Sequence, residues 1–274
     1  MQIDSKSENL PPAIFRWRIF RGVEKVGAKA ISFIESIGRM GLFIKDTFRW
    51  MFRRPFRINA AVEQMMEVGV MSFPVVFFTA IFTGMVLALQ TYNGFERFGA
   101  EGLVGTVVAL SITRELGPVL TALIVAGRAG SAMTASLGTM RVTEQIDALH
   151  TLAANPIKYL VVPRIIAGTI MLPVLTALGD VIGIFGGYVV AVYSYDANPI
   201  VYMQRTFDYL EFNDVFSGLI KAGFFGFNIS LVGCFFGFFT EGGAEGVGKA
   251  TTSSVVAAFL LIFLWNYILT ALFF

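Results

Sequence analysis

The class of this protein follows from residues 68–92, which read VGVMSFPVVFFTAIFTGMVLALQTY. They belong to a run of 28 uncharged residues between Glu67 and Glu96. A helix crosses the hydrocarbon layer of a membrane with roughly 20 apolar residues, at about 1.5 Å of rise per residue. This stretch therefore predicts a transmembrane helix.

Four more apolar segments follow along the chain. Ionisable residues interrupt three of them: Arg114, Glu115 and Arg128 the second, Asp180 the third, and Lys221 the fourth. Of the 274 residues, 55% are hydrophobic and 15% are charged, whereas soluble domains carry about 25% charged residues. We expect an all-α polytopic membrane protein with five transmembrane helices in a domain of residues 61–274. The predicted spans are 68–92, 102–137, 165–195, 215–240 and 253–274.

The segment before the first span is basic and amphipathic. Residues 1–57 hold 12 of the 21 Lys and Arg residues, against five acids. Apolar residues recur at steps of three and four, which marks one face of a helix. With Trp17, Phe20 and Trp50 nearby, residues 1–60 are predicted to form a helix in the inner-leaflet interface; a coiled coil or a packed core helix is the alternative. The apolar stripe consists of Ile19, Val23, Val26, Ala30, Phe33, Ile37, Met40 and Ile44.

The charges that flank the spans predict the orientation, because cytoplasmic segments carry an excess of Lys and Arg. With the N-terminus inside, the basic first segment, Arg141, Lys158, Arg164 and Lys249 are cytoplasmic. Most of the flanking acids then lie outside. An odd number of spans puts the C-terminus on the outer side, and no secretory signal is visible before residue 67.

Arg114 and Glu115 lie about 12 residues into the second span and are followed by Pro118. Charges at that depth are costly unless they are paired or face a cavity, so they suggest a functional site. A proline permits a bend at that point. Two readings remain open: a buried ion pair that fixes packing, or a substrate path. Gln90 and Tyr92, at the outer end of the first span, are weaker candidates, since an interfacial Tyr is usually a membrane anchor.

Several enzymatic readings are excluded. Residues 243–250, GAEGVGKA, match a phosphate-binding P-loop except at the last position, where Ala250 replaces Ser or Thr. This stretch is expected to be a loop between two spans, so ATP would bind in another subunit. One His and one Cys form neither a metal site nor a catalytic triad. We expect no enzymatic activity, no cofactor and no nucleic-acid partner.

Residues 138–156 form a polar segment between the second and third spans. Thr143 followed by Glu144, Gln145 and Asp147 is an N-terminal helix signature, and Pro156 closes the segment. A short cytoplasmic helix there suits a transporter that receives force from a motor subunit, although a plain connector would look similar.

Small residues recur every four positions in two of the spans, which lets helix backbones approach closely in lipid. Simple packing within the chain is one explanation of these ridges, and contact with another chain is the other. The ridges are Ala122, Ala126, Gly130, Thr134 and Gly138, and Gly179, Gly183, Gly187 and Ala191.

Several motifs together resemble the MlaE family of ABC permeases over essentially everything after residue 60. The motifs are GMVLALQTY (84–92), RELGPVLTAL (114–123), AGRAGSAMTA (126–135), MRVTEQIDAL (140–149), Asn155-Pro156 with Pro163-Arg164, and GGAEGVGKATT (242–252). The resemblance implies a homodimer of permeases in the inner membrane of Gram-negative bacteria, which moves phospholipid between the inner and outer membranes. It implies as partners a cytoplasmic ABC ATPase, a periplasmic MCE-domain protein and, in some systems, a STAS-domain subunit.

The resemblance also implies roles for individual residues. Gln90, Tyr92, Arg114 and Glu115 would lie near the lipid path. Arg141, Glu144, Gln145 and Asp147 would lie at the contact with the ATPase. Some relatives carry an acid where this chain has Asn266, so a charge-based role there is not expected. A stand-alone channel or ion-coupled carrier, and a membrane scaffold for an MCE complex, are the alternative functions.

Overall fold

The computed structural model describes residues 34–54 and 57–273, and these residues are almost entirely helical. They fall into two compact units that divide between Phe48 and Arg49. Residues 34–51 are helical, and they include the last three members of the predicted stripe, Ile37, Met40 and Ile44. Residues 1–33 of that predicted helix lie outside the described residues, and residues 52–54 form a turn and bends, so the helix ends at residue 51.

The described residues contain five helical segments that are long and apolar enough to cross a membrane, which confirms the predicted fold class. Each has a mean hydropathy of 1.6 or more over its most apolar window. The first and third start about ten and eight residues before the predicted spans, because short helical turns precede the apolar runs. The five segments are Ile58–Glu96, Glu101–Val142, Ile157–Tyr195, Phe212–Phe238 and Gly243–Phe273.

The last segment corrects one expectation. Residues 243–250, expected to be a loop, are the first turns of α11 (Gly243–Phe273). The change of direction takes place at Gly242 and Gly243, whose φ angles are +88° and +68°. Glycine adopts such angles without steric cost, so these two residues make the turn and leave the rest of the glycine-rich stretch free to be helical.

Turns of π-helix interrupt the first two segments and begin the third, and such turns are frequent at functional sites. The first segment consists of α2 (Ile58–Met65), η1 (Met66–Val70) and α3 (Phe73–Glu96). The second consists of η2 (Glu101–Leu103), α4 (Val104–Ser111), η3 (Ile112–Leu116), α5 (Gly117–Val125), η4 (Ala126–Gly130) and α6 (Ser131–Val142). The remaining elements are α7 (Gln145–Thr151), η5 (Ile157–Val161), α8 (Val162–Tyr195), α9 (Pro199–Tyr209) and α10 (Phe212–Phe238).

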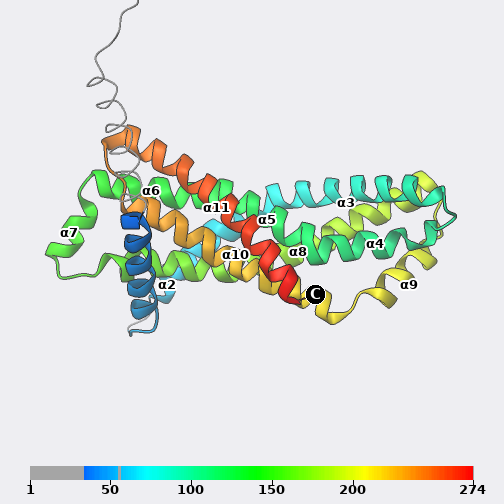
Figure 1. Cartoon of the computed structure of the whole chain (residues 1–274), viewed down its shortest axis with the longest axis horizontal. Helices are drawn as coiled ribbons and strands as arrows, with labels where there is room; N and C mark the ends of the chain where they lie inside the picture. The colour runs from blue at the N-terminus through cyan, green and yellow to red at the C-terminus, as the bar shows by residue number, and fades with distance from the viewer. Residues whose placement is uncertain (1–33, 55–56, 274) are drawn as a thin grey trace, which may run out of the picture. The chain divides into compact units, whose positions relative to one another are not determined.

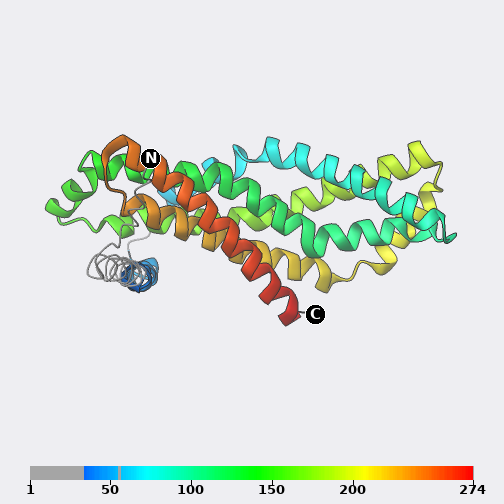
Figure 2. The ribbon, with the colours of Figure 1, turned by 45° about the horizontal axis from the view of Figure 1, so that its top comes forward.

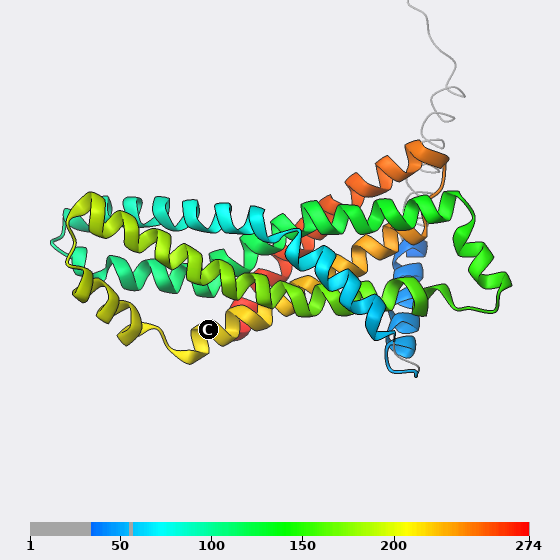
Figure 3. The same ribbon diagram turned by 180° about the vertical axis from the view of Figure 1, so that it is seen from behind.

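Within the second unit, α8 is the central helix (Figure 1). It packs against α3 on one side and α10 on another, and α10 packs in turn on α6 and α11. The view from behind shows α3, α4 and α8 side by side towards one end, with α9 below them and packed on α4 (Figure 3). At the opposite end, α7 projects past the other helices of this unit (Figure 2).

The small-residue ridges pack within the chain. A Cβ atom added to Gly84 of α3 would overlap the backbone carbonyl of Gly183 of α8. The ridge on α6 faces α10, where the hydroxyl of Thr134 lies 3.0 Å from the carbonyl oxygen of Gly233. Intrachain packing therefore explains both ridges, as close backbone approach in lipid requires small side chains.

Candidate functional site: a buried polar cluster

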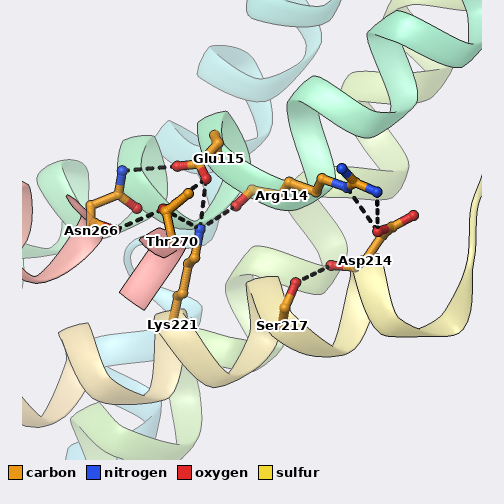
Figure 4. Close-up of polar contacts among 7 residues, drawn as sticks. All are labelled: Arg114, Glu115, Asp214, Ser217, Lys221, Asn266 and Thr270. Carbon is orange, nitrogen blue, oxygen red and sulfur yellow. Dashed lines mark hydrogen bonds and ion pairs between the residues drawn. The ribbon is translucent and has the colours of Figure 1, made fainter. Parts of the chain in front are cut away.

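Seven polar residues from three helical segments meet inside the membrane part of the molecule (Figure 4). We call them the polar cluster. Its members lie on η3 (Arg114, Glu115), on α10 (Asp214, Ser217, Lys221) and on α11 (Asn266, Thr270).

Lys221 is the centre of the cluster. It is fully buried, with 0% of its surface exposed. Its Nζ donates hydrogen bonds to Oε1 of Glu115 at 2.7 Å and to the hydroxyl of Thr270 at 2.8 Å. An ammonium group loses its hydration when buried and is retained only with such partners, so the contacts explain how α10 can hold a lysine inside an apolar helix.

The backbone carbonyl of Arg114 is a third acceptor for Lys221, and Pro118 explains why it is available. In a regular α-helix the carbonyl of Arg114 accepts a hydrogen bond from the N–H of residue 118, and proline has no N–H. Nζ of Lys221 lies 2.9 Å from that carbonyl oxygen. The proline noted in the sequence thus leaves a backbone acceptor available to the lysine at the π-helical turn.

Arg114 forms the second ion pair of the cluster. Its Nε and one terminal nitrogen lie 2.7 Å and 2.6 Å from Oδ1 of Asp214. Asp214 also caps α10, because its Oδ2 accepts a hydrogen bond from the backbone N–H of Glu211 at 3.1 Å. The aspartate is therefore held from two directions, and its side chain is 2% exposed.

Asn266 and Thr270 complete the shell of Glu115. The side-chain amide of Asn266 donates to Oε2 of Glu115 at 2.8 Å. The hydroxyl of Thr270 lies 2.9 Å from Oε1 of Glu115 and 2.7 Å from the carbonyl oxygen of Asn266, so its single proton has two acceptors within reach. Asn266 thus takes part as a neutral donor.

The cluster contains two cations and two carboxylates, so its formal charges compensate. The Arg114 and Glu115 side chains are 37% and 36% exposed, while their partners Asp214 and Lys221 are buried. One side of each ion pair is therefore accessible. Paired charges cost far less at membrane depth than isolated ones. Of the two interpretations of Arg114 and Glu115, the structure contains the ion pairs, to Asp214 and to Lys221.

The other two predicted path residues lie apart from the cluster. Gln90 is exposed and lines an open cavity of about 370 Å³ with Phe82, Val86 and Leu116. The ring of Tyr92 stacks on Tyr195 with centroids 4.0 Å apart. Its hydroxyl donates to the carbonyl oxygen of Tyr195 at 3.4 Å. Leu116, which also lines this cavity, follows Glu115 in the sequence, but the cavity lining includes no residue of the cluster.

The four predicted coupling residues lie together around α7. Arg141 pairs with Asp147, with 2.6 Å between Nη1 and Oδ1, and Gln145 Nε2 donates to the Thr143 hydroxyl at 3.1 Å. A helix does begin in this stretch: Glu144 occupies the N-cap position of α7, with a left-handed φ of 59°. The Thr143 hydroxyl donates to the carbonyl of Thr139, at the end of the preceding helix.

Only Ile146 is buried on α7, while Glu144, Gln145, Asp147 and His150 are exposed. The sequence therefore produces a short helix with one fully buried apolar residue and with exposed polar side chains. Over the described residues, no group of His, Cys, Asp and Glu is arranged to hold a metal ion.

The sequence alone does not predict the partners of Arg114 and Glu115. Asp214 lies one residue before the predicted fourth span, and Lys221 lies inside it without an evident partner. The available signal was that Lys221, like Arg114 and Glu115, is ionisable within an apolar span, and such residues pair with one another.

The fold and the cluster define a multi-pass membrane protein with two compensated ion pairs among its apolar helices. The chain belongs to the MlaE permease family, whose model, described as Permease MlaE, matches residues 61–272. It is 51% identical over 249 residues to a probable ABC transporter permease protein of Rickettsia felis, covering 91% of this chain and 96% of that protein.

Two further relatives extend the comparison. A probable ABC transporter permease protein of Synechocystis is 47% identical over 220 residues, covering 80% of this chain and 84% of the relative. The intermembrane phospholipid transport system permease protein MlaE of Haemophilus influenzae is 38% identical over 257 residues, covering 92% and 97%.

Proposed function

We propose that this chain is the membrane-spanning subunit of an ABC transporter that moves phospholipid between the inner and outer membranes of a bacterium. ATP hydrolysis takes place in a separate cytoplasmic subunit, and a periplasmic MCE-domain protein and, in some systems, a STAS-domain subunit complete the complex. The permease works as a homodimer in the inner membrane, with the N-terminus cytoplasmic and the C-terminus periplasmic. Membership of the MlaE permease family carries the proposal, and the name of the Haemophilus relative supplies the phospholipid.

The polar cluster supports a lipid path within this scheme. Arg114 keeps about a third of its side chain exposed while Asp214 holds it in place. A guanidinium in that state can donate hydrogen bonds to a lipid phosphate, because Arg presents several donors in a fixed geometry. Glu115, Gln90 and Tyr92 would line the same route.

The α7 region supports coupling to the ATPase. Its exposed face carries Glu144, Gln145 and Asp147, with Arg141 holding Asp147 at 2.6 Å. Polar residues on a projecting helix are suited to a specific contact with another subunit.

Reconstitution tests the path. Fluorescent phosphatidylethanolamine would be followed between vesicles carrying the assembled complex and acceptor vesicles. The double variant Arg114→Gln/Asp214→Asn removes one ion pair without leaving an unpaired charge. We expect assembly to persist and transport to fall at least about tenfold, because a charge-assisted phosphate contact is lost. Unchanged transport in an intact complex would instead favour a scaffold role.

Copurification tests the coupling. A tagged chain should retain the ATPase, and Glu144→Ala and Asp147→Ala should reduce that retention. The matched control is Asp208→Ala, an exposed acid on α9 at the opposite end of the bundle. A wild-type chain that never retains an ATPase would exclude the ABC assembly and favour a stand-alone channel or carrier.

A further inference from the structure

A second cavity lies where the first and third membrane segments begin, and no residue of the polar cluster lines it. Its volume is about 270 Å³, and all the residues that line it belong to the second compact unit. The walls are mainly apolar and come from α2 and from the start of α8. The residues of these walls are Ile58, Ala61, Val62, Met65, Val162 and Ile166.

Three cations surround the same cavity: Arg53, Arg57 and Lys158. The ring of Trp50 contacts two of them: the Arg53 guanidinium lies 5.0 Å from its centre, and Lys158 Nζ lies 5.7 Å from it. Lys158 Nζ also donates to the carbonyl oxygen of Arg54 at 3.1 Å.

The third cation, Arg57, lies with its guanidinium 4.3 Å from the ring centre of Tyr159. Within residues 34–54 and 57–273, none of the ion pairs found involves Arg53, Arg57 or Lys158. Among the described residues that line the cavity there are three cations and no carboxylate, so the lining favours an anion.

From this combination we infer that the cavity is a binding site for an anionic glycerophospholipid of the surrounding membrane. The phosphate contacts Arg53, Arg57 and Lys158, and part of one acyl chain occupies the apolar walls. A volume of about 270 Å³ is below the roughly 300 Å³ at which pockets for whole drug-sized ligands begin. It therefore accommodates a segment of chain and leaves the rest of the lipid in the bilayer.

The position of the cavity fits this occupant. Arg57 immediately precedes the first membrane segment, and Lys158 is the second residue of the third. Basic pockets at such ends bind acidic headgroups, and Trp is typical of the same depth. The inference does not rest on the proposed transport function, because the site shares no residue with the polar cluster or with α7.

Lipid binding to the purified full-length chain tests the inference. The retention of phosphatidylglycerol and of phosphatidylcholine would be titrated in a neutral detergent by native mass spectrometry. We expect phosphatidylglycerol to bind at least about tenfold more tightly. The variant Arg53→Gln/Arg57→Gln should weaken its binding by about tenfold or more, because hydrogen bonds to a charged phosphate are lost.

The matched control is Arg49→Gln/Arg54→Gln, which removes two positive charges from the same segment at positions that do not line the cavity. It should change the affinity by less than about twofold, since the Arg54 carbonyl remains available to Lys158. A second variant, Val62→Trp, fills the cavity from a half-exposed position without altering charge and should also abolish retention.

Three results would each overturn the inference: equal binding of phosphatidylcholine, an equal loss in the control variant, or competition by glycerol 3-phosphate as effective as that by phosphatidylglycerol. The last would show a free-phosphate site in which the acyl chain has no part.

Discussion

Lys221 on α10 and Glu115 on η3 lie 106 residues apart in the chain, and their charged atoms are 2.7 Å apart. The lysine is inaccessible to solvent, whereas the glutamate side chain is 36% exposed. The pair therefore joins a fully desolvated cation to a carboxylate at the boundary of the cluster.

This asymmetry predicts the effect of breaking the pair. Glu115→Gln leaves the buried Lys221 without its carboxylate and should destabilise the protein by about 3 kcal/mol, the cost of an uncompensated buried charge. Glu115→Gln/Lys221→Met removes both charges and should recover a large part of that loss. Thermal unfolding in detergent, followed by size-exclusion chromatography, measures both variants.

The control for this pair is Lys249→Met, which removes an exposed ion pair to Glu245 in α11. It should change stability by less than about 1 kcal/mol, since such pairs are screened by solvent. If the double variant were as unstable as the sum of its single variants, the two residues would not be coupled.

The close contact between Gly84 and Gly183 predicts that a larger side chain at position 84 lowers stability. A methyl group at this position would overlap the backbone of Gly183, and neither backbone can move without separating α3 from α8. We expect Gly84→Ala to destabilise the protein by about 2 kcal/mol or more, as overpacking does. Expression level and melting temperature in detergent measure the effect.

Gly94 of the same helix provides the matched control, because an added Cβ there meets nothing within 4 Å. Gly94→Ala should be neutral or stabilise by up to about 1 kcal/mol, in line with helix propensity. Equal behaviour of the two variants would mean that the contact between Gly84 and Gly183 does not limit packing.

The buried Tyr202, at the opposite end of the second unit from α7, should make the stability of the protein depend on pH. It is 5% exposed, and its hydroxyl has no hydrogen-bond partner within the described part of the chain. Burial raises the pKa of Tyr202 from 10.0 to about 12. The folded state therefore favours the neutral phenol, and its stability should be complete below pH 10 and fall by about 2 kcal/mol between pH 10 and 12.

The difference between wild-type and Tyr202→Phe unfolding curves isolates this effect from other groups that titrate in alkali. Tyr202→Phe should lose no stability at neutral pH, because the hydroxyl it removes has no partner. Tyr209→Phe, at a position 57% exposed on the same helix, should show the wild-type dependence. Parallel curves for all three proteins would contradict the assignment.

The membrane helices could be predicted from sequence because length and hydrophobicity are local properties of each segment. The partners of Arg114 and Glu115 could not, since they depend on which helices become neighbours after folding. The glycines of residues 243–250 suggest a loop, whereas these residues are helical, because glycine occurs both in turns and at closely packed positions. By contrast, α9 had a local signal: the Asn198 side chain accepts from the N–H groups of Ile200 and Val201, and Pro199 occupies the first turn.

The path and coupling residues remain predictions that rest on resemblance and on their position. Arg114 and Glu115 lie together in one cluster, but Gln90 and Tyr92 contact other residues. The four candidate path residues thus lie in three places: Arg114 and Glu115 in the polar cluster, Gln90 at an open cavity, and Tyr92 in an aromatic stack.

The backbone around α7 has a consequence for how this family could diversify. Glu144 at one end and Ala153 at the other have left-handed φ angles of 59° and 56°, a conformation that non-glycine residues adopt at a cost of roughly 1–2 kcal/mol. The direction of the helix is therefore set by its two junctions and by buried Ile146, not by its outward side chains. Substitutions of those exposed side chains should therefore change what the helix can bind and leave its orientation unaltered.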